Sequence, residues 1–230
     1  MRFFLFFLLI ISFQLSFGQS STDSLEIDNK YREDQFYISA TYNLLGRKPN
    51  GVSQRGFSTG IHFGFIRDMP INKKRNFAIG LGIGLSSNSY NQNVLITETN
   101  GVVVYELIDE SVISFTKNKF TTYLLEVPLE FRWRTSTATK YKFWRIYTGI
   151  KIGYLLHSST KFEGSLGNIK NSKVDIFNDF QYGLTLNAGY STFNFHLYYS
   201  LNTIFNDDAK INNKSFDVNA IKLGLIIYIL

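Results

Sequence analysis

The chain has 230 residues, of which 44% are hydrophobic, 17% aromatic and 18% charged, and it contains no cysteine. The lack of cysteine excludes a disulfide-stapled module and a cysteine-ligated metal site. The formal net charge is +6 at pH 7, and the aromatic content is too high for a disordered chain. The length predicts one medium-sized domain, in which apolar and polar residues are finely mixed because the mean hydropathy is close to zero.

The chain begins with Met1 and Arg2, followed by an apolar run over residues 3–11 and by the small residues Ser16 and Gly18. This pattern predicts a secretory signal peptide over residues 1–18, cleaved after Gly18. A permanent anchor is the weaker alternative, because the run is well short of the ~20 residues of a spanning helix. Residues 19–35 are predicted to form a polar, exposed lead-in to the folded body.

Apolar and polar residues then alternate with a period of two. In residues 120–134, Tyr123, Val127 and Phe131 share one face, and Glu126 and Glu130 share the other. A helix cannot produce this alternation, so each such stretch predicts a strand. Eight are expected, an even number, over residues 36–44, 59–65, 77–85, 120–134, 146–156, 182–190, 195–201 and 221–229.

The connections between these strands alternate in length. Longer polar stretches are expected over residues 46–56, 88–118, 158–174 and 206–216, and shorter ones over residues 68–76, 135–143 and 191–194. Long and short connections therefore lie at opposite ends, as in an up-and-down barrel. The longest stretch contains Val102–Tyr105, which predicts a hairpin beyond the barrel. The expected fold is all-β: an eight-stranded antiparallel up-and-down transmembrane β-barrel over residues 36–230.

A soluble lipocalin-like barrel would alternate in the same way, but three features favour a membrane. Tilted strands of about twelve residues match the ~25 Å apolar band of an outer-membrane barrel. Many strand glycines share the polar face, which suits a narrow lumen. Aromatic residues gather near the short turns like an interfacial girdle, namely Phe131, Trp133, Phe143, Trp144, Tyr190, Phe193 and Phe195. The chain is therefore predicted to contact outer-membrane lipid as a multi-pass barrel.

The last strand carries Lys222, Gly224, Ile227 and Ile229. Their spacing resembles the terminal-strand signal of outer-membrane barrels, although the chain ends in Leu230 instead of an aromatic residue. An ordinary terminal strand is the alternative interpretation.

Residues 123–129, with the sequence Tyr-Leu-Leu-Glu-Val-Pro-Leu, are followed by a glycine-rich stretch over residues 147–156. Together they resemble the PorT-like outer-membrane β-barrel family of Bacteroidetes-type bacteria. The resemblance implies an eight-stranded outer-membrane barrel, and the role of the family's namesake is that of an accessory of type IX protein secretion. Charged residues after Pro128 depart from the family pattern.

Proline in mid-strand lacks the N–H of a paired ladder, so Pro128 is a candidate bend or bulge. A candidate charge cluster is expected to face the lumen, because a cation facing lipid costs roughly 2–4 kcal/mol. We expect it to fill the barrel with salt bridges, whereas a charged conduit or binding pocket is the alternative. Eight strands are too few for a general diffusion pore. The cluster comprises Glu126, Glu130, Arg132, Arg134, Arg145 and Lys151.

His62, His157 and His196 are all predicted to face inward as hydrogen-bonded filler. No catalytic motif is present, so no catalytic, cofactor-binding or metal-binding residue is assigned. The function expected is that of a non-enzymatic accessory of secretion or envelope assembly. The alternatives are a small porin-like channel and a barrel enzyme acting on lipid or peptide.

Basic residues concentrate near the short turns. They are interpreted as solvated turns or as a site for anionic headgroups or a periplasmic partner from a secretion complex. Nucleic acid is not expected as a partner, because the signal peptide exports the chain. The residues are Lys73, Lys74, Arg75, Arg134, Lys140, Lys142 and Arg145.

Overall fold

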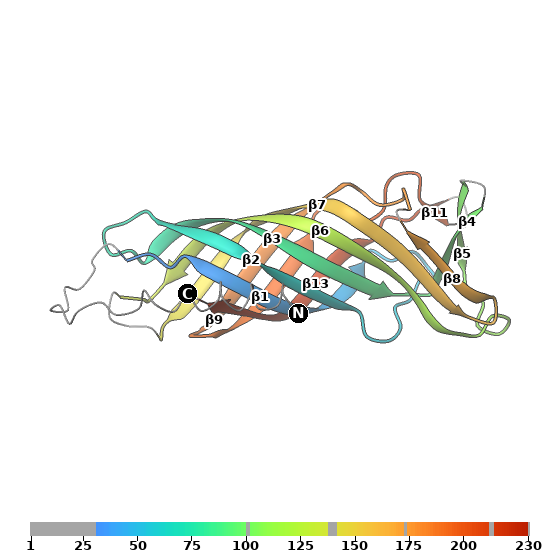
Figure 1. Cartoon of the computed structure of the whole chain (residues 1–230), viewed down its shortest axis with the longest axis horizontal. Coiled ribbons are helices and arrows are strands. Elements are labelled where there is room, and N and C mark those ends of the chain that lie inside the picture. Colours follow the sequence, from blue (N-terminus) through green and yellow to red (C-terminus); the bar gives the residue numbers. More distant parts are fainter. Residues whose placement is uncertain (1–30, 100–101, 138–141, 173, 212–213, 230) are drawn as a thin grey trace, which may run out of the picture. The chain divides into compact units, whose positions relative to one another are not determined.

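The computed structural model describes residues 31–99, 102–137, 142–172, 174–211 and 214–229 (Figure 1). The predicted signal peptide and residues 19–30 of the lead-in lie outside these ranges. Within them, no helix is long and apolar enough to cross a membrane. The strands are β1 (Gln35–Gly46), β2 (Thr59–Pro70), β3 (Phe77–Asn91), β4 (Val94–Thr99), β5 (Val102–Leu107), β6 (Phe115–Arg134), β7 (Trp144–Gly164), β8 (Gly167–Ser172), β9 (Phe180–Tyr190), β10 (Phe193–Ser200), β11 (Lys210–Ile211), β12 (Lys214–Ser215) and β13 (Asn219–Ile229).

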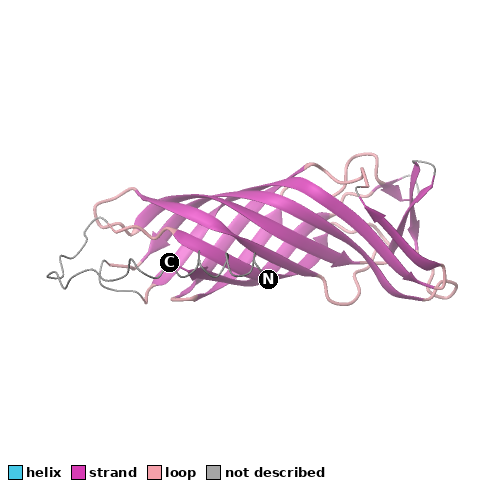
Figure 2. Cartoon of the chain, viewed as in Figure 1, coloured by secondary structure: helices cyan, strands magenta, loops and turns pink. Residues whose placement is uncertain are grey.

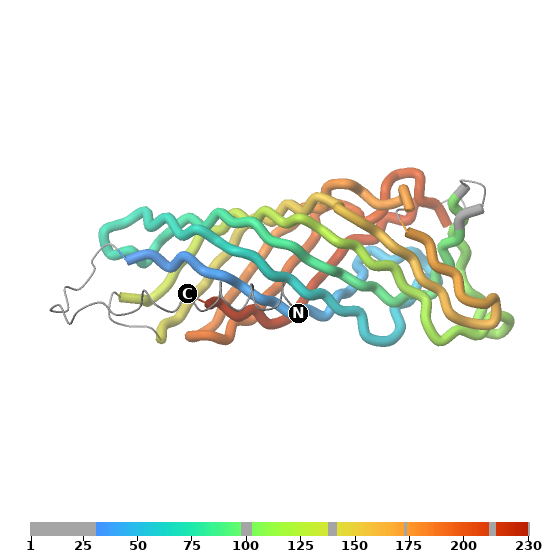
Figure 3. Tube along the Cα trace, in the orientation of Figure 1, coloured from blue at the N-terminus to red at the C-terminus, as the bar shows by residue number. Residues whose placement is uncertain are grey.

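Eight of these strands form a closed antiparallel barrel. Each pairs with its neighbours in the order β1, β2, β3, β6, β7, β9, β10 and β13, and β13 pairs back onto β1. Figure 2 shows these tilted strands as one continuous wall, and Figure 3 shows the first and last strands side by side. Closure satisfies the backbone hydrogen bonds of both terminal strands. The predicted fold class and all eight predicted strands are confirmed.

The two ends of the barrel differ. Residues 71–76 and 191–192 form tight connections at one end, which we call the short-turn end, and Arg134 of β6 pairs with Arg145 of β7 at the same end. The strands β4, β5, β8 and β11 gather at the other, the long-loop end (Figure 1). There β4 pairs with β5, so the hairpin predicted around Val102–Tyr105 is confirmed. The strands β6 and β7 also extend well beyond their predicted bounds, and β8 pairs with the extension of β7.

Side chains alternate between the interior and the outer face. On β1, Tyr37 and Ser39 are buried, whereas Phe36 and Ile38 are more than half exposed. The outer face carries the same apolar character around the wall, and Trp144 packs against Tyr190 near the short turns with ring centroids 5.2 Å apart. Phe143 is an exception to the predicted girdle. It is buried in the interior, where its ring lies 4.5 Å from the guanidinium of Arg145.

A β-bulge on β7 reverses which side chains face outward in the part of the strand that lies towards the long loops. Tyr123 pairs with His157 but Leu124 pairs with Leu155, so Leu156 is one extra residue in β7. Beyond the bulge His157 faces outward beside Tyr123, with rings 5.8 Å apart. The prediction that His157 faces inward is therefore wrong. No register shift occurs at Pro128, which pairs with Lys151 on one side and faces Gly82 across a gap in the β3–β6 ladder.

An apolar cluster fills the long-loop end. Phe120 and Tyr90 of the barrel wall stack with ring centroids 4.9 Å apart, and Phe205 packs on Phe120 at 5.1 Å and on Phe216 at 4.6 Å. Val52 and residues of β4 join them. The connections that the sequence indicated to be polar thus carry a hydrophobic core of their own.

Candidate functional site

Asp68 is the hub of an ion network inside the barrel near the short-turn end. Both of its carboxylate oxygens accept hydrogen bonds from Arg134, each at 2.7 Å, and Oδ1 also accepts one from Arg132 Nη1 at 3.0 Å. All three side chains are fully buried. Such a network stabilises a fold only when every charge is paired and held in good geometry. Asp68 lies in β2 because this strand runs past its predicted end to Pro70.

Arg132 connects this hub to the rest of the interior. Its Nε donates to Glu130 Oε2 at 3.0 Å, and its guanidinium lies 4.4 Å from the centre of the Tyr147 ring. The Arg132 side chain also lies close to Gly80, where an added Cβ would be 2.7 Å from Arg132 Nε. Glycine is therefore required here, because any side chain would occupy the space of the arginine.

The end of the predicted lead-in closes the barrel at this end. Glu33 is buried, and its carbonyl oxygen accepts a hydrogen bond from Arg132 Nη1 at 3.3 Å. Gln35 is also buried and accepts one from Arg132 Nη2 at 3.2 Å. The prediction of an exposed lead-in is therefore wrong for Glu33 and Gln35, since the arginine draws this segment inside.

A second network lies further along the interior, centred on Glu126. Its Oε2 is 3.1 Å from Lys151 Nζ, and both oxygens are 3.2 Å from His62 Nδ1. His196 hydrogen-bonds to Asn187 Oδ1, and Asn187 Nδ2 donates to Glu130 Oε1 at 3.1 Å. Asn187 thus links His196 to Glu130 of the first network, and the His196 ring lies 6.2 Å from the ring of His62.

The remaining predicted residues lie in the same wall. Arg145 is buried, but among the described residues no acceptor reaches its Nε or Nη1, and it is surrounded by the rings of Phe143 and Tyr228. Lys222 faces the interior with Nζ 4.8 Å from the Tyr198 ring. Gly224 pairs with Thr41 where β13 meets β1, and the ladder continues through Ile227 and Ile229 to the end of the barrel wall.

The chain Thr41–His62–Glu126 has the connectivity of a nucleophile, a base and an acid. Thr41 Oγ1 lies 3.3 Å from His62 Nε2. However, Thr41 donates its proton to Asn43 Oδ1 at 2.8 Å, and all three residues are buried. Nucleophilic catalysis needs a substrate within reach of the hydroxyl, and this position is closed. Among the described residues there is also no group of three or more ligands suited to a metal ion.

Comparison with known proteins places this barrel in a family. The family described as "Outer membrane protein beta-barrel domain" matches residues 14–206. The chain belongs to this family. It is a protein of the outer membrane, and its outer face contacts lipid.

No curated protein matches this outer-membrane barrel. Among solved structures it is similar to the attachment invasion locus protein Ail of Yersinia pestis, with 16% identity, 86% of this chain and 97% of that chain covered, and a TM-score of 0.36. The structure of Ail in complex with the heparin analogue sucrose octasulfate gives 15% identity, coverages of 85% and 98%, and a TM-score of 0.34. At these values the likeness says nothing of what this barrel binds.

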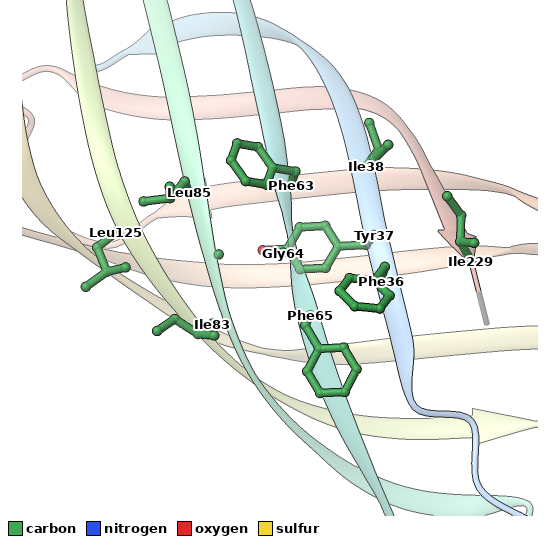
Figure 4. Close-up of a pocket in the computed structure, with 11 residues that line it drawn as sticks. Phe36, Tyr37, Ile38, Phe63, Gly64, Phe65, Ile83, Leu85, Leu125 and Ile229 are labelled. Carbon is green, nitrogen blue, oxygen red and sulfur yellow. The ribbon is translucent and has the colours of Figure 1, made fainter. Parts of the chain in front are cut away.

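The lipid-facing wall of the outer-membrane barrel has an apolar hollow over β1, β2 and β3 (Figure 4). Phe36, Phe63 and Phe65 border it. Gly64 and Gly84 leave room there for the inward ring of Tyr37, which would contact a Cβ at either position. The hollow lacks charged residues, so it belongs to the surface that acyl chains cover.

Asp68, Asn187 and Tyr147 belong to the interior networks but are not among the residues predicted from the sequence. Asp68 was assigned to a connection, although extending the alternation from Gly64 through Ile66 would have placed it on the inner face. The basic surface at the short-turn end is also smaller than expected, because Arg134 and Arg145 are buried. Lys73, Lys74 and Lys142 are exposed there, and Lys140 lies outside the described residues.

Proposed function

We propose that this outer-membrane barrel is a non-enzymatic and non-conducting accessory of protein secretion or envelope assembly, as the PorT-like resemblance implies. The observation that carries the proposal is the closed interior. Arg132, Glu126 and Phe120, which lie at successive levels of the barrel, are each no more than 1% exposed. A water-filled pore would expose such side chains to solvent. We therefore assign the function to the outer surface of the barrel and to the proteins that bind it.

Each carboxylate of the two interior networks contacts a basic side chain, which supports a structural role for the networks over a catalytic one. Asp68 and Glu130 contact arginines, and Glu126 contacts a lysine and a histidine. A general acid or base has to exchange a proton with a substrate, and none of these carboxylates faces an open space. These three interior carboxylates are therefore not accessible for enzyme activity on lipid or peptide.

The proposed partner surface is the β2–β3 turn at the short-turn end, where Lys73 and Lys74 are exposed. In an outer-membrane barrel the short turns face the periplasm. A pair of exposed lysines there attracts an acidic periplasmic surface of a secretion complex.

Co-purification after mild detergent extraction tests this role. The wild-type protein should retain envelope partners, and Lys73→Glu/Lys74→Glu should lose them. The matched control Lys48→Glu/Lys210→Glu makes the same charge change at exposed long-loop sites and should keep them. A clean monomer, together with intact secretion in a deletion strain, would count against the proposal.

Two further measurements separate the alternatives. Planar-bilayer conductance of the purified protein should be near zero, and large steady channels would support the porin-like alternative. Thr41→Val removes the only hydroxyl hydrogen-bonded to His62 among the described residues and should leave lipid and peptide hydrolysis unchanged. Loss of such an activity with retained folding would support the enzyme.

A further inference from the structure

The extended strands β6, β7 and β8 place three lysines in one row on the outer wall. Lys119 pairs with Lys161 on the neighbouring strand, and Lys161 pairs with Lys170 on the next. Like charges directly opposite one another destabilise a sheet. The row therefore costs stability, and a ligand that neutralises it would remove that cost.

Only one carboxylate accompanies this row among the described ion pairs. Glu163 lies 3.0 Å from Lys117 Nζ and also contacts Lys161. Neither Lys119 nor Lys170 has an acidic partner within the described residues. Four lysines and one glutamate leave a net charge of +3 on this face.

A row of hydroxyls lies directly beside the lysines, two residues nearer the apolar band. Across four strands it joins side chains that pair with one another, and the Oγ1 of Thr121 lies 3.5 Å from the Oγ of Ser89. The members of the row are Ser89, Thr121, Ser159 and Ser172, of which Thr121 is buried and the three serines are half-buried or exposed. Hydroxyls both donate and accept hydrogen bonds, so they suit the hydroxyls of a sugar.

The height of these rows identifies the environment they face. Tyr123 marks the edge of the apolar band on the side of the long loops. Lys119 precedes it by four residues in β6 and lies that much closer to the long loops. Four residues rise ~13 Å along a strand, or ~10 Å in height at a tilt of ~40°. The headgroup layer adds roughly 5–8 Å to each side of the hydrocarbon core. The hydroxyl row, at ~5 Å, thus lies within the headgroup layer, and the lysine row lies just outside it, where long side chains can reach back to the headgroups.

We propose that this wall, formed by β3, β6, β7 and β8, binds the phosphorylated sugar headgroup of an outer-leaflet glycolipid. The lysines contact its phosphates, and the accessible serine hydroxyls of the row hydrogen-bond its sugars. Adjacent strands are ~4.8 Å apart, so three lysines span ~10 Å, enough to contact more than one phosphate of a single headgroup. Side chains that project sideways from the wall meet lipid, whereas a soluble ligand would bind the loops above.

Binding of lipid A carrying two phosphates tests the proposal, measured by native mass spectrometry of the full-length protein in mixed detergent micelles. Lys119→Gln/Lys161→Gln/Lys170→Gln should bind about a hundredfold more weakly than wild type, since each lysine near an anionic lipid surface contributes about a factor of five. The control Arg47→Gln/Lys48→Gln/Lys210→Gln removes the same charge from exposed long-loop sites and should bind like wild type.

Glu163→Gln gives a readout that misfolding cannot imitate, because it frees Lys117 and Lys161 and should strengthen lipid A binding severalfold. It also keeps the test decisive if the triple variant fails to fold. Equal binding by the triple variant and its control would overturn the proposal. So would an unchanged affinity of Glu163→Gln for lipid A. A loss confined to a soluble sulfated oligosaccharide, with lipid A binding intact, would assign the lysines to a soluble polyanion instead.

Discussion

The two ends of the barrel interior are filled by opposite chemistry. Towards the short turns, Asp68, Arg132 and Arg134 form a buried ion network held by continuous strands. Towards the long loops, Phe120, Phe205 and Phe216 form an aromatic cluster to which the connections contribute. Both regions exclude water from the barrel.

The difference shows what each kind of support can hold. Buried ions offset their desolvation only in accurate geometry, which a fully paired wall provides because its backbone hydrogen bonds fix every strand. Apolar packing has no directional requirement, so side chains from separate connections can fill the mouth without being held by a ladder. The short-turn end, where paired strands fix the geometry, therefore contains the buried charges, and the long-loop end contains the aromatic cluster.

The largest effect is expected from breaking the ion network. Asp68→Asn leaves Arg134 without an acid and removes one acid from Arg132, which should lower the free energy of unfolding by about 3–5 kcal/mol. Denaturant unfolding of the protein refolded in lipid vesicles measures this. Glu163→Gln is the matched control, because Glu163 also contacts two cations but at the surface, and it should change stability little. Equal losses in the two variants would remove the distinction between the interior and the surface.

A substitution in the aromatic cluster should unfold the long loops locally and leave the barrel wall intact. Phe205→Ala removes contacts with Phe120, Phe177 and Phe216 at an expected cost of about 3 kcal/mol. We expect faster protease cleavage and hydrogen exchange in the long loops, while heat-modifiable gel migration of the barrel is unchanged. Phe57→Ala, at a residue 75% exposed near the same end, is the control and should alter neither. Global unfolding of the Phe205 variant would show that the two ends are one cooperative unit.

The central network should give a smaller loss than Asp68. Glu126→Gln leaves Lys151 without a carboxylate, at a cost of about 2 kcal/mol. Glu126→Gln/Lys151→Met removes both charges and should recover part of that loss in the same unfolding measurement. A loss of unfolding free energy in the double variant that exceeds the sum of the losses in Glu126→Gln and Lys151→Met would contradict this ion-pair account.

The smallest effect is a pH dependence at the surface. Hydrogen bonds from Lys161 and Lys117 hold the pKa of the Glu163 carboxyl below its usual range. Because the folded-state pKa is lowered, the stabilisation is present above the unfolded pKa of about 4.3 and is lost as pH falls through the lowered folded value. Wild type and Glu163→Gln should therefore differ slightly in unfolding at neutral pH and converge in acid. A difference that grew as the pH fell would reverse the sign.

The barrel could be predicted from the sequence because lipid and lumen impose opposite chemistry on successive residues. That alternation places Phe36 and Ile38 outside and Tyr37 and Ser39 inside, and it recurs in every strand of the wall. The need to shelter charge likewise indicated an inward direction for Arg132 and Lys151, which the structure places in the interior.

The contents of the interior were harder to predict. Asp68 meets Arg132 and Arg134 across 64 and 66 residues of sequence, and no local pattern records such a pairing. The aromatic cluster draws single residues from several connections, so no one segment looks apolar. Phe177, Phe205 and Phe216, three phenylalanines in connections, were the available signal.

The extra residue at Leu156 reverses the inward and outward alternation of the β7 residues that follow it. Strict alternation from Lys151 would turn Lys161 and Glu163 into the lumen and Phe162 towards the headgroups. With the bulge, Phe162 is buried and Lys161 meets Lys119 and Lys170 on the outer wall. A single inserted residue thus lets one continuous strand use one phase of alternation in the hydrocarbon layer and the opposite phase above it.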